Sequence, residues 1–313
     1  MKFTFISIIA LAGYAAVPIS AQAAKGDSGS GTNLNVDCSQ NQTVSAAINA
    51  LRSPRLSGQH TINVSGACHE NIVIQGMDRL TLNAAPGASI TDASGGNAYV
   101  IQVLDSRNVS IDNFTINGGS NGITCSDGSL CRLNGNTVLN AGSVGVAVEA
   151  ISQAFVIGGT VQGSGAAGMD VSDGSSAEVS GVTIVNNPGN GMQILGQSFV
   201  ITDSTIANNG GGIFVSHNGT LRCTRCQITG NAEIGVIVRR DSSARFSGQY
   251  VVTGNSGGGI LLTESSSAYF ANAGTVTGNP SGMDVVCGTS FTTARQATFN
   301  IGGGTTNCVE PSP

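Results

Sequence analysis

Glycine recurs in this 313-residue chain at a nearly constant interval. Each of eight glycines is followed one and three places later by an apolar residue, as in Gly168-Met169-Asp170-Val171. Stacked repeats share one continuous core, so a repeat of this kind is a better guide to domain count than chain length. The sequence therefore predicts one elongated domain. The eight glycines lie 21 to 24 residues apart and are Gly122, Gly145, Gly168, Gly191, Gly212, Gly235, Gly259 and Gly282.

Two more columns of apolar residues keep the same interval. One is an apolar-x-apolar pair, at Val109 and Ile111, Cys131 and Leu133, Ala154 and Val156, Ala177 and Val179, Phe199 and Ile201, Leu221 and Cys223, Ala244 and Phe246, and Ala268 and Phe270. The other is a single residue, at Ile116, Val138, Val161, Ile184, Ile206, Ile228, Val252 and Val276. A period of two is typical of strands, so each turn of about 23 residues is predicted to hold three short strands. The predicted fold is all-β: a single-domain right-handed parallel β-helix of about ten turns.

A column of asparagines follows the single apolar column. It consists of Asn187, Asn209, Asn231, Asn255 and Asn279, each a few residues before the next glycine or its flanking turn. Stacked asparagine side chains can bond one another and the turn backbone, and they support a left-handed conformation that Asn and Gly tolerate. We therefore expect an asparagine ladder along one corner of the β-helix.

The ends of the chain differ in composition from the repeats. Residues 1–24 combine Lys2, an apolar run and Ala21-Gln22-Ala23, which predicts a cleaved signal peptide and hence a secreted protein, whether extracellular, on the cell surface or periplasmic. No later stretch is apolar enough to span a membrane. The predicted segments after the signal are a flexible leader at 25–37, a capping segment at 38–59 with one amphipathic helix at 43–51, the β-helix at 60–286, and a C-terminal cap and tail at 287–313.

Eight cysteines in an exported chain favour disulfides. They form four pairs that are close in sequence: Cys38 with Cys68, Cys125 with Cys131, Cys223 with Cys226, and Cys287 with Cys308. The alternative for Cys223-Thr224-Arg225-Cys226 is a redox motif activated by its arginines. Redox pairs of this spacing use a helix N-terminus, whereas this one lies in a predicted strand, so a structural disulfide is favoured.

The period and the register of residues 60–286 resemble those of the pectate-lyase-like superfamily of right-handed parallel β-helix proteins. The resemblance implies the fold and an exported protein. It does not imply one activity, because this scaffold carries lyases, hydrolases, epimerases, adhesins and inert shafts.

Outward positions of the glycine strand form two ladders on one long face, at the second and fourth places after each glycine. The second-place ladder is Thr124, Ala147, Asp170, Gln193, Phe214, Ile237, Leu261 and Asp284. The fourth-place ladder is Ser126, Glu149, Ser172, Leu195, Ser216, Arg239, Thr263 and Val286. Polar residues at the strand ends extend this face, at Asp127, Asp173, His217, Arg240 and Glu264.

Two neighbourhoods on this face are candidate sites. Glu149, Asp170 and Asp173 could bind Ca²⁺ or divide into a general acid and a general base. The second neighbourhood, His217, Arg239, Arg240 and Asp241, could orient a uronate carboxylate or move a proton. The simpler interpretations are solvated surface acids and a surface salt-bridge cluster. No other cofactor is indicated.

The order Asp170, Gln193, His217 and Arg239 on successive turns is similar to the run of catalytic positions in polygalacturonase-like hydrolases. Those enzymes have an adjacent aspartate pair where this chain has Gln193-Ile194, and an Arg-x-Lys motif where it has Arg239-Arg240. The resemblance therefore lacks its general acid. The catalytic candidates on this face are His217, Arg239, Arg240 and Asp170. The substrate-binding candidates are Glu149, Asp173, Gln193, Phe214 and Asp241.

Two functions remain open from the sequence. One is an exported β-helix that binds an acidic polysaccharide, with cleavage or epimerisation as a further option. The other is a non-catalytic adhesion or structural rod that contacts a protein partner, or a second copy, through an apolar patch of Leu195, Phe214, Ile237 and Leu261. A nucleic-acid partner is disfavoured, because the formal net charge is -5 and Lys25 is the only lysine after Lys2.

Overall fold

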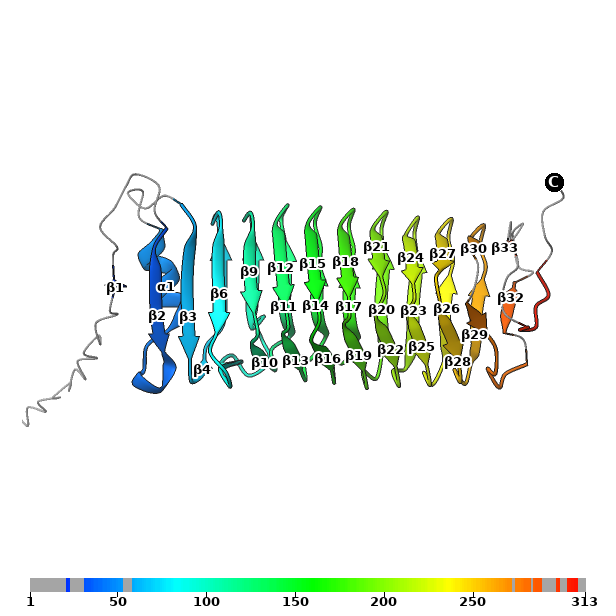
Figure 1. The fold of residues 1–313 in the computed structure, drawn as a ribbon, viewed down its shortest axis with the longest axis horizontal. Helices are drawn as coiled ribbons and strands as arrows, with labels where there is room; N and C mark the ends of the chain where they lie inside the picture. The colour runs from blue at the N-terminus through cyan, green and yellow to red at the C-terminus, as the bar shows by residue number, and fades with distance from the viewer. Residues whose placement is uncertain are drawn as a thin grey trace, which may run out of the picture.

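The repeats stack into a straight rod in the computed structural model (Figure 1). The structure describes residues 21–22, 31–52, 58–271, 274–282, 284–288, 297–298 and 303–308. The predicted signal peptide, apart from Ala21–Gln22, lies outside the described residues. Within the described part, no helix is long and apolar enough to cross a membrane. The predicted right-handed parallel β-helix is confirmed: three sheets, A, B and C, run along the rod, and each turn between residues 60 and 287 adds one strand to each sheet.

Sheet A contains 13 strands, all parallel except the first. Each inward residue stacks on its equivalent one turn away, as in Leu221 beside Ala244 and Cys223 beside Phe246. The strands are β1 (Ala21–Gln22), β2 (Asn33–Asp37), β3 (His60–Ser65), β6 (Leu80–Ala84), β9 (Val109–Asp112), β12 (Leu130–Asn134), β15 (Gln153–Ile157), β18 (Ser176–Ser180), β21 (Phe199–Thr202), β24 (Thr220–Thr224), β27 (Ser243–Ser247), β30 (Ser267–Phe270) and β33 (Ala297–Thr298).

Sheet B contains ten short parallel strands. Their inward residues from Ile116 onward are the predicted single apolar column, and Cys68 and Ile90 extend that column toward the N-terminus. Ile184, Ile206 and Ile228 are register partners in consecutive strands, so they lie in one file. The strands are β4 (Ala67–His69), β7 (Ser89–Thr91), β10 (Thr115–Asn117), β13 (Thr137–Leu139), β16 (Thr160–Gln162), β19 (Thr183–Val185), β22 (Thr205–Ala207), β25 (Gln227–Thr229), β28 (Val251–Thr253) and β31 (Thr275–Val276).

Sheet C contains the glycine phrase. Met169 and Val171 are buried and Asp170 between them is half-buried, which is the predicted alternation. The strands are β5 (Ile72–Gln75), β8 (Ile101–Leu104), β11 (Asn121–Ser126), β14 (Val144–Val148), β17 (Ala167–Val171), β20 (Asn190–Leu195), β23 (Gly211–Ser216), β26 (Ile234–Val238), β29 (Gly258–Leu262) and β32 (Val285–Cys287). The glycines are needed because a Cβ on Gly168 would come within 3 Å of Ile184, Asn187 and Gly191 atoms.

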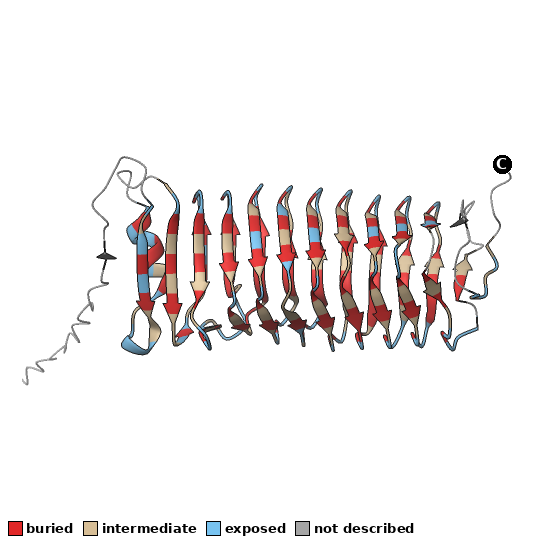
Figure 2. Cartoon of the chain, viewed as in Figure 1, coloured by how far each residue is buried: buried red, intermediate tan, exposed pale blue. Residues whose placement is uncertain are grey.

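The core is the space enclosed by the three sheets (Figure 2). Buried Val, Ile, Leu, Met and Phe side chains form one continuous cluster from the first turns to the last. The stack of inward side chains excludes water along the whole rod, and apolar burial of this kind is the main favourable term in folding. Near its C-terminal end the core is aromatic, with Phe246 stacked on Phe270 at 5.1 Å between ring centroids.

The predicted asparagine ladder lies at the corner between sheets B and C. Asn209 donates from its backbone N and from Nδ2 to Oδ1 of Asn231, at 2.9 and 3.1 Å, and the same pair of bonds recurs at the next turns. Nδ2 of Asn231 also donates back to the carbonyl of Ile206. Each buried asparagine therefore joins three turns. The left-handed residue is the one before it, for example Asn208 with φ 55°.

A serine ladder, not anticipated from the sequence, lies at the corner between sheets C and A. Each hydroxyl accepts a bond from the backbone N of the equivalent residue one turn earlier, at 3.1 to 3.2 Å. The serines are buried and recur every 23 residues, at Ser106, Ser129, Ser152, Ser175 and Ser198. The constant spacing of these serines could have predicted the ladder from the sequence, but serine was not among the residue types followed through the repeats.

One turn of sheet A breaks the predicted register. Phe199 and Ile201, predicted to point inward, are half-buried outward residues, while Val200 and Thr202 pair with the inward Ala177 and Val179. The segment Phe199-Val200-Ile201 is continuously apolar, so a period of two does not distinguish its faces. A shift of one residue moves every side chain to the other face. The correction places Phe199 on the outer surface.

The N-terminal end is closed by helix α1 (Val44–Leu51), as predicted, together with the short 3₁₀ helix η1 (Cys38–Gln40). Val44, Ala47, Ile48 and Leu51 are its buried face. Thr43 is the N-cap, and its hydroxyl accepts a bond from Ala46 N at 3.2 Å.

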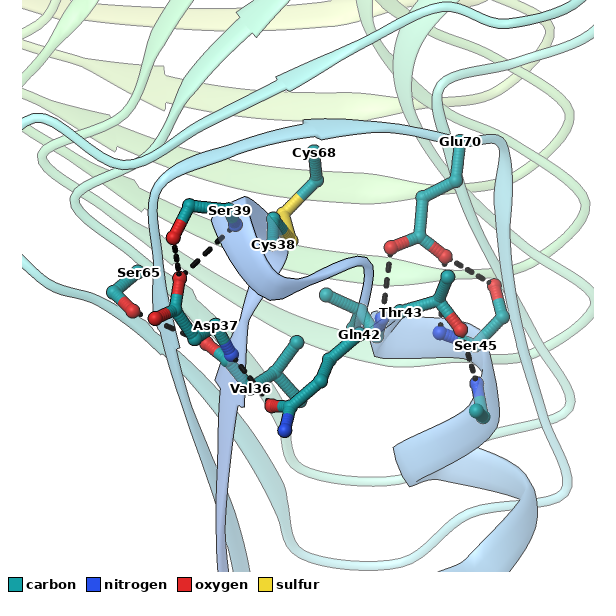
Figure 3. The surroundings of a disulfide bond; sticks show 12 residues. Val36, Asp37, Cys38, Ser39, Gln42, Thr43, Ser45, Ser65, Cys68 and Glu70 are labelled. Carbon is teal, nitrogen blue, oxygen red and sulfur yellow. Dashed lines mark hydrogen bonds between the residues drawn. A yellow bond between two sulfur atoms is a disulfide. The ribbon is translucent and has the colours of Figure 1, made fainter. Parts of the chain in front are cut away.

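The carboxylate of Glu70 also holds the start of α1 (Figure 3). It accepts bonds from the backbone N of Val44 and of Ser45, at 2.7 and 3.0 Å, and from the Ser45 hydroxyl. An anion at a helix N-terminus satisfies unpaired N–H groups and interacts favourably with the helix dipole. The predicted leader 25–37 needs correction, because Asn33–Asp37 is strand β2 and pairs with β3. Its apolar Leu34 and Val36 are buried under the first turn.

All four predicted disulfides form. Cys38–Cys68 ties η1 to strand β4 beside the capping helix (Figure 3). Cys223 and Cys226 are both fully buried, which supports the structural interpretation of that pair over the redox one.

The last turn departs from the glycine pattern. Ile260 pairs with Val285 and Leu261 with Val286, so Asp284 and not Gly282 occupies the glycine position. Asp284 was predicted to face outward and is instead buried at the end of the asparagine ladder, where its Oδ1 accepts from Asn279 Nδ2 at 3.0 Å. A carboxylate can only accept hydrogen bonds, so it terminates a ladder in which every preceding asparagine donates onward.

Candidate functional site

The outer face of sheet C carries the residues singled out from the sequence. Its second-place ladder begins with buried Thr124 and Ala147 and continues with half-buried side chains. Asp170 pairs in register with Gln193, Gln193 with Phe214, and Phe214 with Ile237. The candidates therefore stand in one file, one per turn, at a separation of about 4.8 Å between turns.

The carboxyl groups at the N-terminal part of this face form one electrostatically coupled cluster. Burial raises the pKa of Glu149 above its ordinary value, and the charges of Asp170, Asp173 and Asp127 raise it further. Burial likewise raises the pKa of Asp170; a bond of 2.7 Å from the Ser172 hydroxyl opposes this, and the charge of Asp173 adds to it. The structure therefore brings these predicted acids together, and the raised pKa of Glu149 and of Asp170 makes their protonated forms easier to reach than in a free side chain. A protonated carboxyl group can donate a hydrogen bond or a proton, and calcium binding here stays a prediction.

Arg239 packs over an aromatic ring of the preceding turn. Its guanidinium carbon is 4.7 Å from the centroid of the Phe214 ring. The Arg239 Nε is buried and has no hydrogen-bond partner. The ring orients this guanidinium through a cation–π contact, and no carboxylate of the described residues forms an ion pair with it.

His217, Arg240 and Glu264 form a chain across three turns at the corner that follows sheet C. Arg240 Nη1 lies 2.6 Å from His217 Nε2, and Arg240 Nε donates to Glu264 Oε2 at 3.1 Å. Arginine has no acceptor, so His217 Nε2 accepts and the proton of the neutral ring is on Nδ1. The sequence analysis grouped Asp241 with this cluster. Asp241 lies exposed beside it, and Glu264 is the acid that forms the ion pair.

The predicted apolar patch is only partly exposed. Leu195, Phe214, Ile237 and Leu261 are all half-buried, and Arg239 covers Phe214. An apolar groove of about 430 Å³ does lie at the C-terminal end of this face. Its lining includes Ile234, Ile260, Leu261 and Val286.

The outer face of sheet A carries a feature that the sequence analysis missed. A groove of about 290 Å³ runs over strands β24, β27 and β30 and contains two exposed arginines, Arg222 and Arg245, and exposed Tyr269. These three side chains are register partners on consecutive turns. The signal was the residue between each pair of inward apolar residues. Only the inward positions of sheet A had been considered, whereas both the inward and the outward positions of sheet C had been.

Comparison with known proteins agrees with this architecture. The chain belongs to the family described as periplasmic copper-binding protein (NosD), whose model matches residues 34–199, more than half of its length. A model described as right handed beta helix region matches residues 144–299. With these matches, the disulfides indicate an extracellular or periplasmic protein. No curated protein sequence matches the chain.

Two solved structures align with most of this chain. The A-module of mannuronan C-5 epimerase AlgE6 from Azotobacter vinelandii is 12% identical, with a TM-score of 0.51 over 86% of this chain and 91% of that one. Pectate lyase Pel9A is 14% identical, with a TM-score of 0.34 over 80% of this chain and 78% of that one. At this level of identity the epimerase module supports the β-helix fold alone, as the pectate-lyase-like resemblance implied.

The copper in the family's description does not fit the described residues. Copper sites use His, Cys and Met ligands. Every described cysteine is in a disulfide, and the described methionines Met77, Met169 and Met192 are buried in the core. His60 is buried in the first turn, His217 is bonded to Arg240, and exposed His69 belongs to no group of three potential ligands. Among the described residues, the only group of three potential ligands is Cys38, Cys68 and Glu70. Its cysteines are bonded to each other and its carboxylate holds helix α1, so it is not a copper site.

Proposed function

We propose that this chain is an exported β-helix protein that binds an acidic polysaccharide along the outer face of sheet C. The observation that carries the proposal is Arg239, whose guanidinium is oriented by the Phe214 ring and has no ion-pair partner among the described residues. A guanidinium in this state suits the carboxylate of a uronic acid. Gln193, one rung before Phe214, adds an amide that can bond sugar hydroxyls.

The geometry supports binding more directly than cleavage or epimerisation. Proton transfer needs an acid and a base within hydrogen-bond reach of one sugar. The acids with raised pKa are Glu149 and Asp170, whereas His217 follows strand β23, two rungs beyond Asp170, and is bonded to Arg240. Turnover is therefore a separate question, which the same experiment answers.

The test is a binding screen with polygalacturonate, alginate and neutral dextran. Wild-type protein is expected to bind a uronate polymer and not dextran, and the double variant His217→Ala with Arg239→Ala is expected to lose at least tenfold in affinity. Arg132→Ala is the matched control, because Arg132 stacks on Phe155 at 5.0 Å on the other face. Reducing ends and unsaturated ends are measured alongside. Binding that is unchanged in the double variant contradicts the proposal.

The second function, a rod that contacts a protein partner or another copy, is favoured by the apolar groove around Leu261. A second copy is the simplest occupant to test, by solution mass across a concentration series. Self-association that Leu261→Asp abolishes would support it. A strict monomer at every concentration would count against self-association.

A further inference from the structure

We propose that the groove on the outer face of sheet A is a second, independent site for a carboxylate-bearing glycan. We call it the arginine groove. It is defined by Arg222, Arg245, Tyr269, Thr220, Ser243 and Ser267. It lies on a different sheet from the site of the proposed function and does not depend on it.

The positive charges of Arg222 and Arg245 are uncompensated among the described residues. Arg222 and Arg245 are direct register partners on neighbouring strands, so two like charges stand on adjacent rungs. Both side chains are exposed, and neither takes part in an ion pair in the described part of the chain. Like charges directly opposite on a sheet are destabilising. A bound anion between them removes that cost, so the pair favours an anionic ligand.

The side chains of Arg222 and Arg245 point in opposite directions along the rod. Arg222 packs over Phe199 of the preceding turn, with 5.3 Å from its guanidinium carbon to the ring centroid. Arg245 packs over Tyr269 of the following turn, at 4.8 Å. The guanidinium groups therefore lean apart, and a groove of about 290 Å³ opens over the strands that carry them. Aromatic contacts preorganise both donors, which lowers the entropy cost of binding.

The walls of the arginine groove carry hydroxyl groups and an aromatic ring. A row of hydroxyls runs along one side, with Thr220 Oγ1 and Ser243 Oγ 3.4 Å apart and Ser267 on the next rung. Tyr269 is one of the few large apolar side chains that the structure leaves exposed, at 44%. Guanidinium groups recognise carboxylates, hydroxyls bond sugar hydroxyls, and an exposed ring offers a face for a sugar. Together they fit a glycan with regularly spaced carboxylates.

The test compares the arginine groove with a matched position on the same face. Arg222→Gln with Arg245→Gln removes both charges, and Tyr269→Leu removes the ring. The control is Arg132→Gln, an exposed arginine of the same row that stacks on Phe155 and has no arginine neighbour. Binding of polygalacturonate, dextran sulfate and neutral dextran is measured by calorimetry at low and high salt, after circular dichroism has shown that each variant is folded.

The groove variants are measured in the background of His217→Ala with Arg239→Ala, so that binding on sheet C does not mask the arginine groove. The expected result in that background is a residual polygalacturonate affinity that falls at least tenfold in the double arginine variant, about threefold in Tyr269→Leu and not in Arg132→Gln, and that is weakened by salt. Equal residual binding with and without the two arginines, or equal binding of neutral dextran, would overturn the site. Tighter binding of dextran sulfate would overturn the assignment to carboxylates. Loss of binding in His217→Ala with Arg239→Ala, with the arginine groove intact, would leave only the sheet C site.

Discussion

Two rows of side chains run along corners of this rod, one residue per turn, and they differ in both burial and chemistry. The asparagine ladder between sheets B and C is buried and repeats one residue type. The corner row after sheet C is exposed or half-buried and varied. It consists of Asp127, Ala150, Asp173, Gly196, His217, Arg240 and Glu264, all with φ between 51° and 61°.

The comparison separates what the fold requires from what it permits. A buried turn must satisfy its own N–H groups, and a row of identical amides does so at every level. The exposed row meets water, so its residues need only tolerate a left-handed backbone. Chemical variety along such a row is therefore free to serve binding. The tests below begin with the largest expected effect and measure how far this division holds.

Asn231→Ala is expected to have the largest effect. It removes the acceptor of two bonds from Asn209 and leaves buried N–H groups unpaired, so we expect a loss of about 3 kcal/mol in the free energy of unfolding. Asn63→Ala is the control. Asn63 donates to Asn35 and accepts from Asn83 at an outward, half-buried position where water can replace both bonds, so its loss should cost below about 1 kcal/mol. Urea unfolding compares the two variants, and equal losses would end the distinction between buried and outward asparagines.

Asp284→Asn tests the end of the buried ladder. Burial opposes the charge of Asp284, but hydrogen bonds from Thr305 and Asn279 outweigh it and lower its pKa. The lowered pKa means that its contribution is present above the ordinary aspartate range and lost as the pH falls through the folded value. We therefore expect about 1–2 kcal/mol less stability for the variant at pH 7 and a difference that shrinks in acid. A difference independent of pH would show that the charge is not what matters.

Asp170→Asn and Glu149→Gln test the acids beside the exposed row. Their expected effect on stability at neutral pH is opposite in sign to that of Asp284→Asn. Their pKa values are raised in the folded state, by burial first, so their contribution is lost as the pH rises from the unfolded through the folded value. Each variant should therefore be slightly more stable than wild type near neutral pH, with a smaller effect than Asp284→Asn. Thermal unfolding at pH 4 and pH 7 measures it. Destabilisation at pH 7 would mean that the carboxylates have a stabilising partner, such as a bound cation.

Arg240→Ala should have the smallest effect. Its ion pair with Glu264 is exposed, with side-chain exposures of 46% and 40%, and such pairs contribute about 0.5 kcal/mol or less. The urea midpoint should barely change. A loss above about 1 kcal/mol would place the corner row with the structural features of the rod.

Prediction from the sequence succeeded where one residue type recurs on every turn. The sheet B file of Ile184, Ile206 and Ile228 and the asparagine ladder both follow from the interval alone. It was wrong where the pattern is ambiguous. Phe199-Val200-Ile201 offers two apolar alternations, and Gly282 carries the glycine phrase although Asp284 holds its position.

The candidate site was predicted less completely than the fold. Its members were found as outward positions, yet which of them contact each other depends on side-chain direction. Arg239 packs on Phe214, Arg240 joins His217 to Glu264, and Asp241 joins neither contact. In the sequence, Arg222 was considered only as a neighbour of Cys223, and Arg245 was not considered.

The sequence repeat of about 23 residues determined the β-helix, its three sheets and the residues that stack inside it. The reason is that parallel strand pairing requires each turn to repeat the one before it. Tertiary structure chose the one-residue shift at Phe199, the acid that ends the ladder and the opposite leanings of Arg222 and Arg245. Those choices depend on packing and hydrogen bonds between neighbouring turns, which a linear pattern does not encode.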